Sequence, residues 1–391
     1  MIPRFFRHVD SNWVALKTLE LVKVRSQTLG EAEICSIYAK ELERLGLEVF
    51  QREVSDSRFN IYGRLPGAGD PRSLIFNGHL DTIPIGDSWP PRIDGSRIYG
   101  RGSEDMKGGL ASLLAMVRAF NESGTRLAGD LWITAVVGHE DSEAAKDGPL
   151  AMCDDINQGL IKGDAIVIAE GDSELWTMST GSGVFRIRLK SLLEGTHTNN
   201  ITFEINPIRF VAKIIESLYG LQQLMDDGPS HPLAGKEKID IGLVQAGDYY
   251  NRTPEISIIE GIVRWHPGKT ESEMKQLISD LVAPIAKAGE LEYSIEFLMS
   301  REPFETSIDE PILQSALRSI LLSTGNTAKI IGKRIVGDAN IIVAKTGIPT
   351  FYFGPGYQSA HSNNEWVEIE SLAAATKFYG ALAMDYLGEA I

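Results

Sequence analysis

The chain has 391 residues, of which 43% are hydrophobic and 23% charged, and its formal net charge at pH 7 is −15. This length exceeds what one hydrophobic core usually serves, so we expect two domains. The excess of acidic residues argues against a nucleic-acid partner, which would require clustered Lys and Arg.

No apolar run approaches the roughly 18 to 20 residues that span a bilayer, so we expect no membrane partner. The first residues are basic but lack an apolar segment followed by a small-residue cleavage site, which argues against a secretory signal. The two cysteines, Cys35 and Cys153, are too few for a disulfide framework. A cytoplasmic location is therefore the expectation.

The first part of the chain alternates helical and strand-like patterns. Helical periodicity covers Asp10–Val24, Glu31–Leu45 and Met106–Phe120. Short apolar runs typical of buried strands occupy Leu74–Asn77, Leu131–Val137 and Ala165–Ala169. Each run is followed directly by a polar cluster, and open α/β sheets place their active sites beyond the carboxyl ends of their strands.

Between residues 183 and 299 the pattern changes to strand, helix, strand, strand, helix, strand. The predicted segments are residues 184–191, 207–221, 239–247, 257–266, 271–288 and 291–299. This is the split βαβ order of a ferredoxin-like α+β domain. We therefore expect this domain at residues 183–299 and a catalytic domain formed by residues 1–182 and 300–391.

After residue 299 the patterns return to those of an α/β domain. We predict a helix over Pro311–Leu322, strands at Ile341–Lys345 and Thr350–Gly354, and a closing helix over Ile369–Leu387.

Five short segments hold His and carboxylate residues in settings that indicate one dinuclear metal site. They are Gly78–Pro84, Gly100–Gly109, Val136–Glu143, Ile168–Asp172 and Phe353–Glu365. Imidazole nitrogen and carboxylate oxygen suit a borderline divalent ion such as zinc, and two ions need roughly five or six side-chain ligands, one of them a shared carboxylate.

In their order and neighbours these segments resemble the zinc-dependent family of aminoacylases, acetylornithine deacetylases, succinyl-diaminopimelate desuccinylases and co-catalytic carboxypeptidases. The resemblance runs from about Phe76 to about Leu372. It implies an α/β catalytic domain with a dinuclear zinc site and a mixed central sheet flanked by helices. It also implies an inserted α+β lid domain, which in the family often forms a dimer contact, so we expect a homodimer.

The resemblance assigns the metal ligands residue by residue. His79, Asp105 and Glu170 hold one divalent ion, and Asp105, Glu140 and His361 hold the other, with Asp105 as the bridge. Zinc is the expected metal, with cobalt or manganese as alternatives. Asp81 follows His79 in a His-x-Asp pair at a strand end, where it is placed to orient the imidazole. The glycines at 354 and 356 are expected to let the backbone pass close to a substrate.

The segment around His139 departs from the family, whose members mostly carry two adjacent Glu residues there, a general base and then a ligand. Counting without gaps from Asp105 makes His139 the base and Glu140 the ligand. A shift of one residue makes Glu140 the base and Asp141 the ligand. Either an imidazole or a carboxylate can take a proton from an activated water.

Three residues of the predicted lid domain match family positions less closely. His197 lies where relatives carry a His that stabilises the oxyanion from the partner subunit. Asn251 and Arg264 lie where a substrate carboxylate would be held through charge-assisted hydrogen bonds.

These residues predict a metal-dependent hydrolase that cleaves an amide bond of an N-acyl amino acid or short peptide with a water bridging two zinc ions. The alternative is a metal-binding paralogue without hydrolytic activity that acts as a binding or regulatory protein. A nucleotide-dependent enzyme is excluded because no G-x-x-x-x-G-K or G-x-G-x-x-G motif opens a helix. The acyl group and the amine of the substrate do not follow from these residues.

Overall fold

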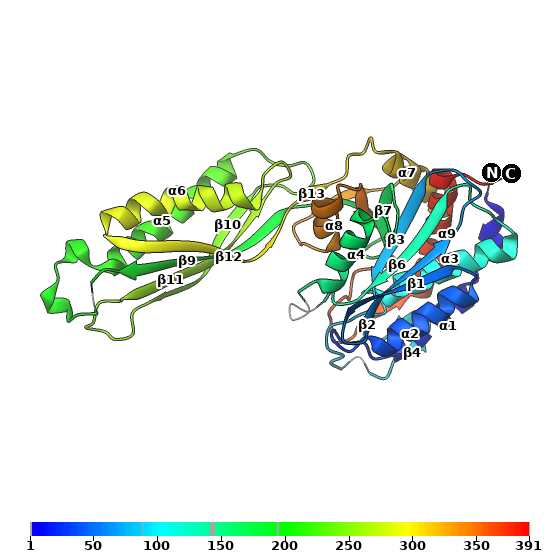
Figure 1. Ribbon diagram of the computed structural model, residues 1–391, viewed down its shortest axis with the longest axis horizontal. Coiled ribbons are helices and arrows are strands. Elements are labelled where there is room, and N and C mark those ends of the chain that lie inside the picture. Colours follow the sequence, from blue (N-terminus) through cyan, green and yellow to red (C-terminus); the bar gives the residue numbers. More distant parts are fainter. Residues whose placement is uncertain (1, 88, 141–144, 194, 391) are drawn as a thin grey trace. The chain divides into compact units, whose positions relative to one another are not determined.

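The computed structural model describes residues 2–87, 89–140, 145–193 and 195–390 (Figure 1). The chain divides into two compact units. The first comprises Met1–Thr177, Thr306–Ile331 and Ile341–Ile391, and the second comprises Met178–Glu305 and Gly332–Asn340. The sequence places its second domain at residues 183–299, and residues 332–340 join the second unit in addition.

The first unit is built on a mixed sheet, as expected, whose strands run in the order β1-β2-β6-β3-β7-β15-β8. In chain order they are β1 (Glu48–Ser55), β2 (Arg58–Leu65), β3 (Ser73–His79), β6 (Asp130–Val136), β7 (Ala165–Ile168), β8 (Leu175–Ser179) and β15 (Thr350–Tyr352). Strand β3 pairs in parallel with both β6 and β7, so the carboxyl ends of these three strands meet at one edge. The short strands β13 (Phe304–Glu305) and β14 (Ile330–Lys333) pair with β8.

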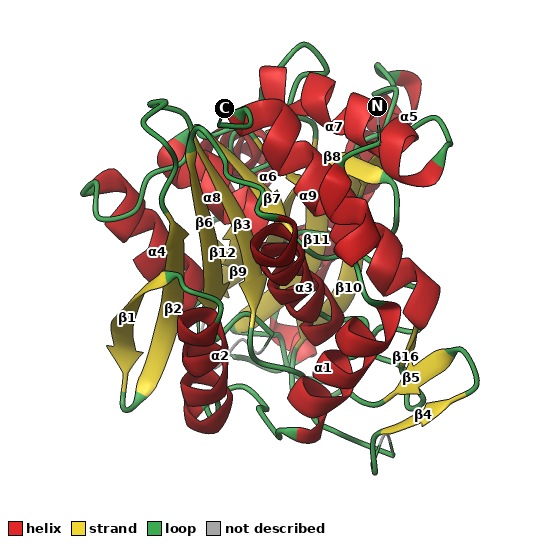
Figure 2. Cartoon of the chain, turned by 90° about the vertical axis from the view of Figure 1, so that its right-hand side faces the viewer, coloured by secondary structure: helices red, strands yellow, loops and turns green. Residues whose placement is uncertain are grey.

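Four helices cover one face of this sheet (Figure 2). They are α1 (Ser11–Lys23), α2 (Ala32–Arg44), α3 (Lys107–Ser123) and α9 (Ile369–Leu387), and the unit also contains η1 (Arg4–His8), α4 (Asp147–Asn157) and α7 (Pro311–Thr324). Helix α3 is buried along most of its length. A Cβ atom on its Gly109 would lie 1.8 Å from the carbonyl oxygen of Ala169, so only glycine lets the start of α3 rest against the end of β7.

The predicted strand at Ile341–Lys345 is wrong, because this segment lies in helix α8 (Asp338–Thr346). A short apolar run fits a buried helix as well as a strand. Asp338 in the first turn and Lys345 in the last turn complement the helix dipole. Gly347 follows with φ of 69°, a left-handed conformation that often ends a helix.

The second unit contains a four-stranded antiparallel sheet in the order β10-β11-β9-β12, the ferredoxin-like arrangement. Its elements are β9 (Gly181–Ser191), η3 (Thr198–Asn200), η4 (Phe203–Ile205), α5 (Pro207–Asp227), β10 (Lys238–Ala246), β11 (Ile256–Trp265), α6 (Glu271–Ala288) and β12 (Leu291–Arg301). Alternate residues of β9, Phe185, Ile187 and Leu189, are buried in a core shared with both helices. Strand alternation and helical periodicity thus bury one common apolar face.

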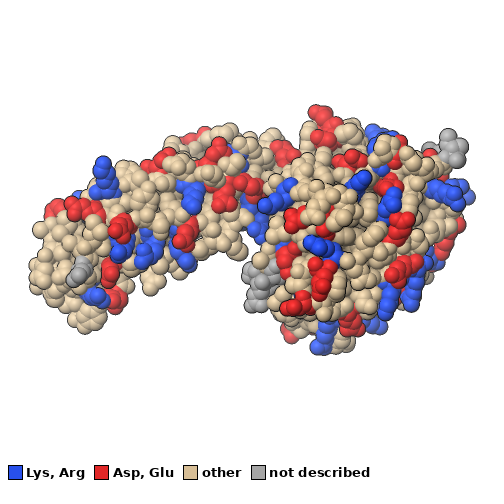
Figure 3. All heavy atoms as spheres, viewed as in Figure 1, with Lys and Arg blue, Asp and Glu red and all other residues tan. Residues whose placement is uncertain are grey.

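A small sheet, β16-β5-β4, completes the first unit with β4 (Arg92–Asp94), β5 (Arg97–Tyr99) and β16 (Trp366–Glu368). Every helix among the described residues is too short or too polar to cross a bilayer. On the face drawn in Figure 3, basic and acidic side chains are interspersed over both units.

Candidate metal centre

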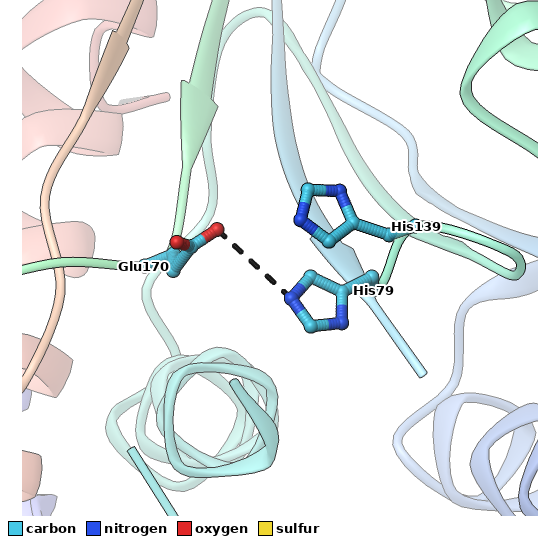
Figure 4. Close-up of side chains that lie close together, drawn as sticks. All are labelled: His79, His139 and Glu170. Carbon is cyan, nitrogen blue, oxygen red and sulfur yellow. Dashed lines mark ion pairs between the residues drawn. The ribbon is translucent and has the colours of Figure 1, made fainter. Parts of the chain in front are cut away.

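The polar residues predicted at strand ends converge at the carboxyl edge of the parallel strands. His79 is the last residue of β3, His139 and Glu140 follow β6, and Glu170 follows β7. Figure 4 shows His79 and His139 side by side, with Glu170 facing His79. Ligand atoms of His79, Asp105 and Glu140 lie within 4.8 Å of one another, as do those of His79, His139 and Glu170.

The two carboxylate oxygens of Asp105 face two different imidazoles. Its Oδ1 lies 3.0 Å from Nε2 of His79, and its Oδ2 lies 3.3 Å from Nε2 of His361. Two ligand atoms bound tetrahedrally to zinc at about 2.0–2.1 Å lie roughly 3.3 Å apart. Both distances therefore fit a cation between each pair of atoms, with Asp105 shared.

The outer ligands predicted for each ion lie beside the matching imidazole. Oε2 of Glu170 is 4.0 Å from Nε2 of His79, and Oε2 of Glu140 is 3.2 Å from Nε2 of His361. The side chains of Glu140 and Glu170 are 6% and 7% exposed, whereas that of His361 is 49% exposed. The cluster is therefore buried at Glu140 and Glu170 and reaches solvent at His361.

The tautomer of His79 follows from its hydrogen bonds. Its Nδ1 lies 3.0 Å from the backbone carbonyl oxygen of Asp81, which can only accept. In the neutral ring Nδ1 therefore carries the proton, and the lone pair on Nε2 faces Asp105. Two acceptors at that distance require a proton or a metal ion between them.

The pKa shifts in this cluster favour a protonated His361, a protonated Glu170 and an ionised Asp105. Hydrogen bonds to Asp105 and Glu140 raise the pKa of His361 to about 10. Burial works to raise the pKa of Asp105, but its hydrogen bonds with His361 and His79 outweigh this and lower it. Burial, together with the charge of Asp105, raises the pKa of Glu170 to about 7. A divalent ion that binds here must displace protons.

The backbone at His361 is strained. Its φ is 63°, a left-handed conformation that costs a residue other than glycine of order 1–3 kcal/mol. Such strain persists only where surrounding contacts hold it, and it is typical of functional positions.

Asp81 orients the His79 ring through its backbone and not through its side chain. It holds the His79 ring through its backbone carbonyl, while its carboxylate lies farther away, 3.7 Å from Nδ1. That carboxylate instead accepts the backbone N–H groups of His139 at 3.0 Å and Glu140 at 2.8 Å. Asp81 thus connects the loop after β6 to the loop after β3.

His139 stacks on His79, with ring centroids 4.2 Å apart and planes inclined by 9°. This arrangement brings an imidazole nitrogen of His139 among the ligand atoms of His79 and Glu170. The geometry permits both a general base and a third imidazole ligand at this position. Asp141, the ligand in the shifted alignment, lies outside the described residues.

Two buried carboxylates that the sequence did not single out connect the Asp105 and His361 segments. Glu365 accepts hydrogen bonds from the backbone N–H groups of Gly102, Glu104 and Asp105. It also forms an ion pair with Arg101. In return, Glu104 accepts the N–H groups of residues 358 and 359 and the hydroxyl of Ser359. These hydrogen bonds hold the backbone around Asp105 and the backbone before and after His361 in place against each other.

We expect Glu365→Gln to lower the free energy of unfolding of the metal-free protein by about 3 kcal/mol, because it breaks a buried ion pair and leaves N–H donors without acceptors. Denaturant unfolding measures this change. The control is Glu368→Gln, which breaks the more exposed pair with Arg97 and should cost less than about 1 kcal/mol. Equal effects in the two variants would contradict the role given to Glu365.

The glycines at 354 and 356 lie against other protein atoms. A Cβ at Gly354 would lie 2.4 Å from the carbonyl oxygen of Gly171, and one at Gly356 would lie 2.7 Å from Oε1 of Glu104. These contacts hold the loop before His361 against the loop that carries Glu170.

The three predicted lid residues belong to the second unit, where two of them contact each other. Nδ1 of His197 accepts the backbone N–H of Asn199, so in the neutral ring Nε2 carries the proton. That nitrogen lies 3.2 Å from the side-chain amide of Asn251. The atom of Asn251 placed there is Nδ2, so a donor on Nε2 requires the amide to be turned until its oxygen faces the ring.

Arg264 is half-buried on β11 and donates from Nη1 to the backbone carbonyl of Arg334. Burial lowers the pKa of Arg264, and the charge of Arg334 lowers it further. Among the described residues, neither guanidinium forms an ion pair with an acidic side chain. Arg334 comes from the short return segment at residues 332–340, and no motif in the sequence marks it.

Residues 75–385 match the family described as Peptidase family M20/M25/M40. The chain is 28% identical over 383 residues to the N-formyl-4-amino-5-aminomethyl-2-methylpyrimidine deformylase of Bacillus subtilis, covering 88% of this chain and 87% of that protein. Aminopeptidase PepT from Bacillus cereus has a similar fold, with a TM-score of 0.82, 20% identity and coverage of 97% and 99%. YxeP from Bacillus subtilis, a dinuclear metal binding peptidase, gives a TM-score of 0.73, 16% identity and coverage of 96% and 98%.

Proposed function

The chain belongs to peptidase family M20/M25/M40, and from this membership and the geometry of Asp105 we propose that it hydrolyses an amide bond of an N-acyl amino acid or a short peptide. The observation that carries the proposal is that each carboxylate oxygen of Asp105 faces its own imidazole at 3.0 or 3.3 Å. Such a carboxylate can bridge two cations about 3.5–4 Å apart, the arrangement of two-metal hydrolases. A deformylase and a peptidase among the similar proteins both break amide bonds.

We assign the ligands as the sequence suggested. His79, Asp105 and Glu170 would hold one divalent ion, and Asp105, Glu140 and His361 would hold the other, with zinc as the expected metal and cobalt or manganese as alternatives. When bound, the two ions would polarise the amide carbonyl and activate a water. His79 and His361 offer neutral imidazole nitrogens once their protons are displaced.

His139 is the proposed general base. It takes a proton from the attacking water and returns it to the leaving amine nitrogen, while Glu140 remains a ligand. The contact of Glu140 with His361 supports this division of roles. In the other division, Glu140 is the base and Asp141 the ligand.

The second unit supplies groups suited to substrate binding. Nε2–H of His197 would donate to the developing oxyanion in place of its contact with Asn251, and the backbone N–H of Asn199 on Nδ1 fixes this tautomer. Asn251 remains a proposed partner of a substrate carboxylate. Arg264 and Arg334 offer two positive charges to a substrate carboxylate.

We further propose a cytoplasmic homodimer that acts on a small molecule, with neither nucleic acid nor membrane as partner. Cys35 and Cys153 are buried and are not joined in a disulfide, which is consistent with a reducing compartment. The net charge of −15 supports the exclusion of a phosphate backbone.

A second candidate function is metal binding without hydrolysis. The observation that favours it is the His139 nitrogen among the ligand atoms of His79 and Glu170. If His139 is a ligand, no base remains at that position.

Turnover distinguishes these candidates. We expect the zinc- or cobalt-loaded protein to release amine from at least one member of a panel of N-formyl, N-acetyl and N-succinyl amino acids and dipeptides. The control is the same protein after chelation, which should lose this activity. A loaded protein that binds two ions and turns over nothing would favour the binding role.

If His197 acts across a dimer, mixing His197→Ala with Asp105→Ala should restore part of the activity that each variant lacks. One mixed dimer then contains an intact metal centre together with an intact His197 from the other chain. Activity is measured after subunit exchange, which is verified with differently tagged chains. A mixture that exchanges subunits and stays inactive would confine His197 to a role within its own chain.

A further inference from the structure

The loop after β6 is held by an unusual series of backbone hydrogen bonds. Four successive N–H groups each donate to a side-chain oxygen. The bonds run from Val137 to Asn60, from Gly138 to Glu31, and from His139 and Glu140 to Asp81, at 3.1, 3.0, 3.0 and 2.8 Å. The backbone that carries Glu140 is therefore fixed by side chains from outside its own segment.

Arg58 of β2 holds two carboxylates at once. Its Nε and Nη2 donate to Glu31 at 2.9 and 3.1 Å, and its Nη1 and Nη2 donate to Asp147 at 2.6 and 3.2 Å. Nη1 also donates to Oγ of Ser55 at 2.9 Å. All five guanidinium N–H groups are thus used.

The ion pair between Arg58 and Glu31 is deeply buried, with side chains 5% and 0% exposed, whereas Asp147 is 30% exposed. A buried pair of this kind contributes little net stability, but removing one partner leaves an uncompensated charge. The same Glu31 oxygen that accepts from Nη2 of Arg58 accepts the N–H of Gly138. Arg58 therefore orients the acceptor on which Gly138 depends.

Asn60, two residues along the same strand, spans the two ends of the loop. Its Oδ1 accepts from Val137, while its Nδ2 donates to the carbonyl of Gly148 at 2.8 Å. A Cβ at Gly148 would lie 2.0 Å from the carbonyl oxygen of Val137, so these ends lie against each other. Alternate residues of a strand point to the same face, so Arg58 and Asn60 both face the loop after β6.

The chain enters α4 through two strained residues. Ala145 and Lys146 have φ of 51° and 59°, left-handed values that cost residues other than glycine roughly 1–2 kcal/mol each. Contacts at Asp147 and Gly148 hold the chain immediately after these residues.

We propose that Glu31, Arg58 and Asn60 form a clamp that holds the backbone at Val137 and Gly138, directly before the residues bound by Asp81, and so helps to position the Glu140 carboxylate opposite His361. They are positioning residues and touch no ligand atom of the metal centre. The clamp itself is a property of the folded chain; its consequence for metal binding rests on the proposed function.

Hydrogen exchange tests the clamp in the metal-free protein. Arg58→Lys keeps the charge but cannot supply the planar fork that engages both carboxylates. We expect amide exchange in the peptide that contains Val137–Glu140 to rise by about tenfold or more. The milder Asp147→Asn, at the exposed end of the network, should raise it in the same direction.

The matched control is Arg64→Lys on the same strand. Arg64 donates from Nε and Nη2 to Asp130, the first residue of β6, at the end opposite the loop. This variant should leave exchange of the Val137–Glu140 peptide unchanged. Unchanged exchange in both Arg58→Lys and Asp147→Asn, or an equal rise in Arg64→Lys, would overturn the clamp.

Calorimetric titration with zinc tests its consequence. In Arg58→Lys we expect one ion to bind as in the wild type and the other about 10- to 100-fold more weakly, the usual effect of disturbing the groups behind a ligand. Faster exchange with unchanged affinity for both ions would show that the clamp does not position Glu140 for metal binding. A wild-type protein that binds two ions but hydrolyses no amide would overturn the proposed function and leave the clamp standing.

Discussion

Asp105→Asn is expected to weaken the binding of both divalent ions by more than about 10²-fold, whereas His79→Ala and His361→Ala each remove one ion. The reason is the position of Asp105, whose two oxygens face different imidazoles at 3.0 and 3.3 Å. An amide nitrogen is no metal ligand, and without the negative charge two cations cannot be held close together.

Metal analysis of the three purified variants by mass spectrometry measures this. The control is Glu174→Gln, which removes a carboxylate near Glu170 that pairs with Lys329 at the surface and should retain both ions. Full occupancy in Asp105→Asn would show that the two sites do not share this carboxylate. Loss of both ions in His79→Ala would contradict the assignment of His79 to one ion alone.

Substitutions at His139, Glu140 and Asp141 have the next largest expected effects, on rate. If His139 is the base, His139→Ala keeps both ions and loses about 10² to 10⁴ in turnover, the usual contribution of a positioned base. Glu140→Ala then loses an ion as well as turnover, because Glu140 lies 3.2 Å from the His361 nitrogen.

The alternatives give different patterns across the same variants. With Glu140 as base, Glu140→Ala keeps both ions and loses turnover, while Asp141→Ala loses an ion. If His139 is a ligand, His139→Ala loses an ion from the set that contains His79 and Glu170. Metal stoichiometry and turnover measured together on all three variants distinguish these cases.

Two of the ligand residues, His79 and Glu170, follow a local signal in the sequence, and the family resemblance assigned their roles and the other ligands. A short apolar strand followed by a His or Glu, as at His79 and Glu170, marks the carboxyl end of a strand. Parallel pairing of β3 with β6 and β7 then brings those ends together. The family resemblance added what local pattern lacks, the expectation that His361 joins them from far along the chain.

The supporting contacts could not be predicted in the same way. Glu365 and the backbone of Glu104 are bonded across 261 positions, and Asn60 and Val137 across 77. Nothing in the sequence near either partner specifies the other. The same holds for Asp81, whose carboxylate was expected to hold the His79 ring but bonds the loop after β6.

The predicted secondary structure was correct where an apolar pattern repeats over many residues. The closing helix has the predicted bounds, Ile369–Leu387, because its apolar positions repeat over many turns. The segment Ile341–Lys345 contains only a short apolar run. Asp338 in the first turn and Gly347 after the last turn favour a helix there. Short runs leave the choice to flanking residues and packing.

The most direct test of the metal centre is anomalous diffraction at the zinc absorption edge from crystals of the zinc-loaded protein. The proposed metal centre predicts two peaks about 3.5–4 Å apart, one beside His79 and Glu170, the other beside Glu140 and His361, with Asp105 between them. A single peak, or two peaks of which neither contacts Asp105, would contradict it.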